Sequence, residues 1–169
     1  MHAAAFMKKI IWAIDPYQSK DHELVRDAHE LTAWFGKDDV NRIKPVFVLT
    51  SGVRLLPFGT FRKLLPELKK EAQKKLDHSQ KLLASVQMSK PKLLIHPSEH
   101  VENIASTLLN YAKQEEVDLI ALRTRGKRGL ARFFLGSLAE TLLKRATVPV
   151  LVLNRIEQRE KKSRLRRAA

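Results

Sequence analysis

The sequence predicts an α/β fold, a doubly wound five-stranded parallel sheet with helices on both faces. Short apolar runs bounded by charges or breakers alternate along the chain with longer amphipathic segments. This alternation is typical of strand–helix–strand crossovers, which make neighbouring strands parallel. The runs are apolar at successive positions, as expected for strands that are covered on both faces. The length of 169 residues suits one domain.

Each predicted strand is recognised by its apolar run and by the residues that end it. Asp15 and Pro16 end the first run, because proline cannot donate to a strand ladder. Pro45 is expected to lead into the second. The five predicted strands are residues 10–14, 46–49, 92–95, 119–122 and 150–153.

The predicted helices carry apolar residues at helical spacing. They cover residues 20–35, 66–86, 98–112 and 138–146. Gly36 should end the first helix, Pro66 should occupy the first turn of the second, and Ser98 should cap the third. Residues 50–66 are expected to form a long loop with a short turn. Trp12 and Trp34 fall in apolar stripes and are expected in the core.

The charge is the unusual property of the composition. The formal net charge is +14, and the basic tail, residues 155–169, accounts for +5 of it with seven basic and two acidic side chains. Residues 155–169 are therefore expected to be disordered or to form an extended helix. The predicted division of the chain is an N-terminal extension (1–7), one domain (8–154) and this basic tail. Such a surface attracts nucleotides, nucleic acid or acidic lipid in a salt-dependent way.

Several classes of site have no support in the sequence. Cysteine is absent, which excludes disulfides and thiolate metal sites and agrees with a cytoplasmic location. No apolar run approaches the ~18 residues of a membrane span. Pro97 and Ser98 separate His96 from His100, so we expect no metal site there. No nucleophile elbow or P-loop motif is present, so we expect no enzyme, although weak ATP hydrolysis stays an open alternative.

Residues 118–154 resemble a known family. A glycine loop containing Gly126 and Gly129 is followed by the Gly136–Ser137 turn, a helix, and Pro149 before an apolar strand. Gly126, the nine-residue spacing and the final Pro-Val-Leu-Val resemble the C-terminal signature of the universal stress protein family. Asp15 resembles the aspartate that ends the family's first strand. The resemblance covers about residues 8–154.

The resemblance implies a strand order of 3-2-1-4-5, with a ligand crevice between strands 1 and 4 at their carboxyl ends. In ATP-binding members an aspartate and a second-strand position hold the nucleoside, and the glycine loop and Gly-Ser turn hold the phosphates, with Mg²⁺ an accompanying ion. The residues at these positions here are Asp15, Val48, Arg123, Gly126, Gly129, Gly136 and Ser137. Structural explanations stay open: Asp15 could shape the strand exit, and the glycines and Ser137 could serve turns and a helix cap. Arg123, with the cations that follow it, could form a solvated face.

Two departures from the family pattern leave the function open. Arg123 replaces the first loop glycine, and it could block the pocket or grip a phosphate with its guanidinium. Ala139 stands where nucleotide binders often place a hydroxyl. The first hypothesis is a non-catalytic, homodimeric stress-response protein that binds ATP or another adenine nucleotide. It pairs through the last strand, whose edge would otherwise be exposed. The alternative is a member that does not bind ATP, whose basic loop and tail bind RNA or an acidic protein.

Overall fold

The computed structural model describes residues 9–36, 40–124 and 136–153. Its five strands form one parallel sheet in the order β3-β2-β1-β4-β5, which confirms the predicted fold class and topology. The strands are β1 (Ile10–Ala13), β2 (Ile43–Leu49), β3 (Lys92–Ile95), β4 (Leu119–Arg123) and β5 (Val150–Leu153).

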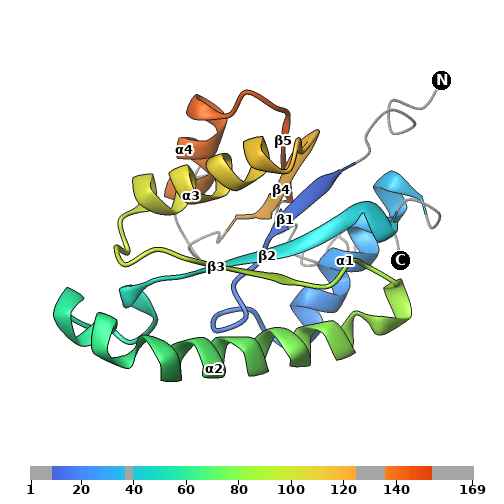
Figure 1. Cartoon of the computed structure of the whole chain (residues 1–169). Helices are drawn as coiled ribbons and strands as arrows, with labels where there is room; N and C mark the ends of the chain where they lie inside the picture. Colours follow the sequence, from blue (N-terminus) through green and yellow to red (C-terminus); the bar gives the residue numbers. More distant parts are fainter. Residues whose placement is uncertain (1–8, 37–39, 125–135, 154–169) are drawn as a thin grey trace, which may run out of the picture.

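Helices cover both faces of the sheet (Figure 1). One face packs against α1 (Asp21–Phe35) and α2 (Phe58–Leu82), and the other against α3 (Val101–Gln114) and α4 (Ser137–Arg145). Three short 3₁₀ helices complete the described elements: η2 (Val40–Arg42), η3 (Ser51–Val53) and η4 (Ala84–Val86).

The central strand shows why its run is apolar throughout. Ile10 and Trp12 of β1 pack into the α1/α2 core, whereas Ile11 between them packs into the α3/α4 core. Successive side chains of a strand point to opposite faces, so burial on both faces requires an apolar residue at each position.

Helix α1 ends where the sequence predicts. Gly36 has a φ of +85° and its amide donates to the Thr32 carbonyl at 2.8 Å. The expectation that Trp34 lies in the core is wrong, because its side chain is 63% exposed. Leu24, Ala28 and Leu31 form the buried stripe of α1, and at about 100° per residue Trp34 falls roughly 80° to one side of it.

Strand β2 begins three residues earlier than predicted and contains Pro45. Pro45 pairs with Trp12 of β1, but β3 joins β2 only from Val46 onward. On the side away from β1, this part of β2 has no partner strand among the described residues. A proline that lacks an N–H is tolerated at such an edge.

Helix α2 begins at Phe58 and not near Pro66, so the predicted long loop is mostly helix. Phe61 in its first turn is buried (2% exposed), which anchors the segment before the proline. Pro66 lies in the helix interior on the exposed side, where water can solvate the carbonyl that loses its partner.

The N-terminus of α3 also differs in detail. The cap residue is His100, and Ser98 lies two residues earlier. The Ser98 hydroxyl accepts hydrogen bonds from the His100 amide (3.2 Å) and the Asn103 side chain (2.9 Å). Ser98 therefore holds the turn before the helix and does not cap it.

Candidate functional site

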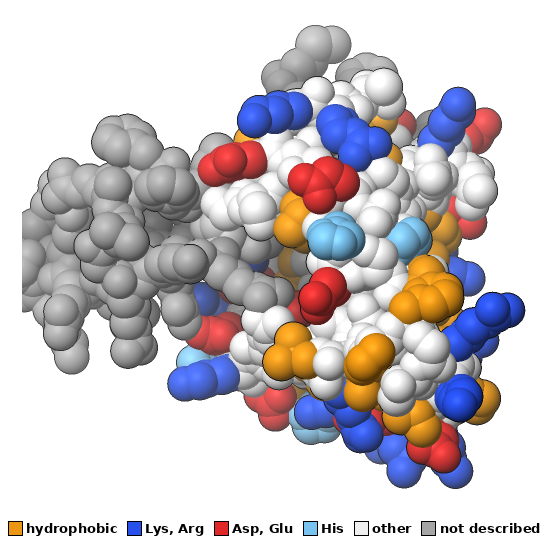
Figure 2. All heavy atoms as spheres, turned by 90° about the vertical axis from the view of Figure 1, so that its left-hand side faces the viewer, with side chains coloured by type: hydrophobic (Ala, Val, Ile, Leu, Met, Phe, Trp, Pro, Cys, Tyr) orange, Lys and Arg blue, Asp and Glu red, His pale blue; other side chains and the backbone are white. Residues whose placement is uncertain are grey.

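The carboxyl ends of β1 and β4 lie side by side at the point where the strand order reverses. Ala13 pairs with Leu122, so the chain leaves β1 at Asp15 beside the end of β4 at Arg123 and Thr124. In open α/β sheets this edge is where ligands bind. Figure 2 views the molecule from this edge and shows histidine and acidic side chains near the middle, with hydrophobic side chains below them.

Asp15 shapes the exit of β1. Its carboxylate Oδ1 accepts a hydrogen bond from the Tyr17 amide at 3.1 Å, and its carbonyl accepts from the amides of Gln18 (3.2 Å) and Ser19 (2.9 Å). The structural explanation of Asp15 therefore holds. It does not exclude a ligand contact, because each carboxylate oxygen has two lone pairs.

Arg123 lies on the α1/α2 face of the sheet. Its Nε donates to Asp27 Oδ2 and its Nη2 donates to Glu30 Oε2 at 2.9 Å, both on α1. The Arg123 side chain is 16% exposed and that of Asp27 is 6% exposed. Blocking the pocket and gripping a phosphate both require this guanidinium at the crevice, whereas the structure joins it to two carboxylates. A phosphate contact would require one of these ion pairs to be exchanged.

Burial is the main influence on the pKa of Asp27. It raises the pKa of this carboxyl above its usual value, and the hydrogen bond and charge of Arg123 oppose that rise. Asp27 Oδ1 is buried without a hydrogen-bond partner. Arg123 is thus the main charge compensation of a buried acid, and its guanidinium acts in the fold at the exit of β4.

The end of β2 presents residues that the sequence analysis did not single out. Val48 is buried on the α3/α4 side, one residue before the strand ends. Beyond it, Thr50 and Ser51 are buried polar residues, and the Thr50 hydroxyl accepts from the Gly52 amide at 3.3 Å. Thr124 at the end of β4 is also buried, and its amide donates to the Leu153 carbonyl at 3.2 Å. The sequence signal that could have identified these residues is a polar residue directly after an apolar run.

The loop after β2 packs tightly against the loop after β3. A Cβ atom on Gly52 would lie 2.6 Å from Glu99 Oε2 and 2.9 Å from Glu99 Cβ, so only glycine fits without a shift. His96 follows β3, and its Nδ1 accepts from the Ser98 amide at 3.1 Å. Within the described ranges, no group of three or more histidine, aspartate or glutamate residues is arranged to hold a metal ion.

Helix α4 starts at the same edge. Gly136 has a φ of +82°, a conformation that favours glycine, and its carbonyl accepts from the Glu140 amide at 3.0 Å. Ser137 is exposed in the first turn, where helix amides lack partners of their own and can bind an anion. Ala139 is 2% exposed in the α3/α4 core, so a hydroxyl at that position would point into the protein interior.

Part of the predicted site cannot be placed. Gly126 and Gly129 lie outside the described residues, and so do residues 1–7 and the basic tail. The described site is therefore Asp15, the polar strand ends and the start of α4.

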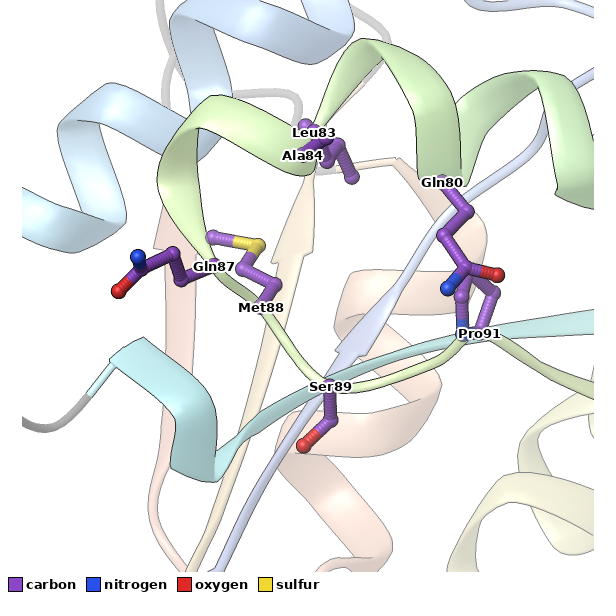
Figure 3. Close-up of a pocket in the computed structure, with 7 residues that line it drawn as sticks. All are labelled: Gln80, Leu83, Ala84, Gln87, Met88, Ser89 and Pro91. Atoms are coloured by element: carbon purple, nitrogen blue, oxygen red, sulfur yellow. The ribbon is translucent and has the colours of Figure 1, made fainter.

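Two cavities of the described part of the chain lie at the opposite, amino edge of the sheet. The smaller, about 140 Å³, lies between the end of α2 and the loop before β3, with Gln80, Ser89 and Pro91 in its wall (Figure 3). The larger, about 350 Å³, is lined by the start of β1, the start of β2 and the end of α3. Neither contains Asp15, Gly136 or Ser137.

No described helix combines the length and the apolar character that crossing a lipid bilayer requires.

Comparison with known proteins connects this geometry to a family. The model of the Universal stress protein family matches residues 7–154. Universal stress protein MJ0531 of Methanocaldococcus jannaschii is 34% identical over 98 residues, which cover 57% of this chain and 54% of that protein. Universal stress protein MJ0577 of the same organism is 30% identical over 89 residues, 53% of this chain and 52% of that protein. The chain spans about half the length of these curated relatives.

Solved structures share the fold. The structure of MJ0577 has a TM-score of 0.64 at 24% identity and covers 88% of this chain and 97% of its own. A universal stress protein from Archaeoglobus fulgidus in complex with dAMP has a TM-score of 0.52 at 20% identity, covering 85% and 95% of the two chains.

Proposed function

The chain belongs to the universal stress protein family, and we propose that it is a non-catalytic stress-response protein that binds an adenine nucleotide at the carboxyl edge of β1 and β4. The observation that carries the proposal is the position of Asp15 beside the end of β4, at the edge where α4 begins with a φ-positive glycine. The dAMP complex of the A. fulgidus protein, which shares the fold, supports the choice of ligand. The absence of cysteine is consistent with a cytoplasmic location.

The proposed contacts divide the nucleotide between two parts of the edge. Asp15 accepts hydrogen bonds from ribose hydroxyls, next to a contact at Val48. Amides at Gly126, Gly129, Gly136 and Ser137 bind the phosphates, with Mg²⁺ when the ligand is ATP. Arg123 acts through its ion pairs to Asp27 and Glu30, which hold the strand end from which the loop departs.

Magnitudes show that the start of α4 is insufficient alone. A helix N-terminus contributes about 0.3–1 kcal/mol to binding an anion, whereas a micromolar Kd corresponds to about 8 kcal/mol. The remainder has to come from base and ribose contacts and from the loop after β4. That loop carries Arg125, Lys127, Arg128 and Arg132 in the sequence.

The test is calorimetry of the full chain with ATP and with AMP, each with and without Mg²⁺. We expect Asp15→Asn to weaken binding about tenfold or more, because a hydrogen bond to a charged group contributes ~1.5–3 kcal/mol. The asparagine keeps an oxygen for the Tyr17 amide, so the turn survives. Asp21→Asn, another acidic residue of the segment after β1, is the matched control and should change Kd less than twofold. The proposal fails if no nucleotide produces heat or a thermal shift.

We also propose a homodimer through β5. Val150, Leu151 and Val152 are only partly buried, and β5 pairs with β4 alone among the described strands. Pairing with a second β5 would remove this edge. Light scattering after size-exclusion chromatography should give twice the chain mass, and Val152→Lys should shift it to the monomer.

A second candidate function rests on the net charge of +14. In this alternative the chain binds no ATP, and its basic loop and tail bind a polyanion such as RNA or an acidic protein. Affinity for a single-stranded RNA should fall steeply with salt and on deletion of residues 155–169, since phosphate contacts release counterions. RNA binding that ignores both changes would contradict it.

A further inference from the structure

The cavity at the amino edge of the sheet has the composition of an anion site. It encloses about 350 Å³, within the range of small-ligand pockets. Its polar lining includes Lys9, Arg42, Lys44, Tyr111 and Glu115, over an apolar floor that contains Ile11. It lies at the opposite end of the strands from Asp15, so it is separate from the proposed nucleotide site.

Tyr111 supplies an unused hydrogen-bond donor. The residue is 7% exposed, and its hydroxyl forms no hydrogen bond with any described residue. That hydroxyl is not sealed in the interior, and Tyr111 is one of the residues that line the cavity. Burial and the charge of Glu115 raise the pKa of Tyr111, and the charge of Lys92 opposes that rise.

Lys44 supplies an unused charge. It lies beside Ile11 in the β1–β2 register and is half-buried on the α3 side of the sheet. No hydrogen bond or ion pair joins its ammonium group to another described residue. A lysine of this kind buries its aliphatic stem and keeps its ammonium in water, so the charge is available to an anion in the cavity that Lys44 lines.

Lys9 offsets the partial negative charge at the end of α3, which would otherwise repel an anion. The carbonyls at the C-terminus of α3 carry partial negative charge and point toward this end of the molecule. The Lys9 ammonium donates to the Glu115 carbonyl at 2.7 Å, and its amide donates to Asp118 Oδ2 at 2.9 Å. Lys9 therefore offsets the negative charge at this end of α3, and Lys44 is the cation of the lining that the described contacts leave for a ligand.

We propose that this cavity binds the phosphate monoester group of a small molecule. Such a group carries about −1.5 to −2 charges at neutral pH and is attracted by the Lys44 ammonium. Lys44 contributes the charge and Tyr111 the directional donor, while the remaining volume accepts a short organic part. A nucleic-acid strand fits less well, because Glu115 in the lining would repel a continuous row of phosphates.

The test is an NMR titration of the full chain with inorganic phosphate and with glycerol 3-phosphate. Amide shifts should concentrate at Lys9, Lys44 and Tyr111. We expect Lys44→Gln to raise Kd at least tenfold and Tyr111→Phe to raise it about threefold. Lys113→Gln removes a charge from the same end of α3 without touching the cavity, and it should change Kd less than twofold.

Three results would overturn the proposal. Equal losses in Lys44→Gln and Lys113→Gln would show attraction by the general charge only. Shifts concentrated at Gly136 and Ser137 would place the anion at the carboxyl edge. A single-stranded oligonucleotide that binds the same residues more tightly than glycerol 3-phosphate would identify a polyanion surface.

Discussion

The two edges of the sheet use polar side chains differently. At the carboxyl edge, Asp15 bonds to the Tyr17 amide, Thr50 bonds to the Gly52 amide, and Arg123 is joined to two acids. At the amino edge, Lys44 and Tyr111 line a cavity and bond to no described residue. The side chains of the carboxyl edge thus hold backbone in place or pair with one another, while the Lys44 ammonium and the Tyr111 hydroxyl at the amino edge form no such bond. Substitutions that remove these bonds at the carboxyl edge should therefore lower stability, whereas removal of the Lys44 ammonium or the Tyr111 hydroxyl should change stability little.

The largest stability loss is expected for Arg123→Met. The variant keeps an apolar stem but leaves buried Asp27 without its main compensation, which costs about 3 kcal/mol in the free energy of unfolding. Chemical denaturation measures it. Arg145→Met is the matched control, since exposed Arg145 bonds to the Glu102 carbonyl and Ser106 on α3 and should contribute less than about 1 kcal/mol. A loss below 1 kcal/mol for Arg123→Met would show that the ion pairs of Arg123 at the carboxyl edge add little to stability, which would contradict the comparison of the two edges.

Gly136→Ala should lower stability by about 1–2 kcal/mol, because alanine is strained at a φ of +82°. No atom lies within 4 Å of the added Cβ, so the loss would be backbone strain and not a clash. Gly59→Ala is the control, since its Cβ also meets open space and its φ is not positive. A thermal melt in which both variants behave alike would show that α4 tolerates another start.

The buried acid predicts a pH dependence. A carboxyl whose folded-state pKa is raised favours the folded state most at low pH. That contribution disappears as pH rises from the ordinary value of 3.8 through the folded pKa. The stability of the wild type relative to Asp27→Asn should therefore fall over this interval, by about 1.4 kcal/mol for each pKa unit. Denaturation between pH 3.5 and 7 measures it. A relative stability that rises with pH would mean that Arg123 dominates over burial.

The smallest stability effect is expected for Tyr111→Phe. Its hydroxyl has no described hydrogen-bond partner, so removing it should change the free energy of unfolding by less than about 0.5 kcal/mol. Denaturant titration provides the measurement. A loss above 1 kcal/mol would show that this hydroxyl supports the fold and would weaken the distinction between the edges.

The sequence predicted the positions of strands and helix ends correctly where a local pattern of residues agrees with the burial found in the structure. The run Val150–Leu153 and the stop at Gly36 are local signals, and both appear in the structure. It failed at the prolines, because Pro45 and Pro66 are tolerated only through their surroundings. Pro45 has no β3 partner opposite it, and Pro66 follows a turn anchored by buried Phe61.

The sequence by itself determined the alternation of strands and helices, and with it the doubly wound sheet, because burial on both faces demands continuous apolar runs. It also brought Asp15 and the start of α4 to one edge, since parallel strands end on the same side. Only the tertiary structure decided where Arg123 points. Its partners Asp27 and Glu30 lie 96 and 93 residues earlier in the chain. It likewise assembled the amino-edge cavity from segments that are far apart in the chain, because no local pattern records which side chains remain without partners after packing.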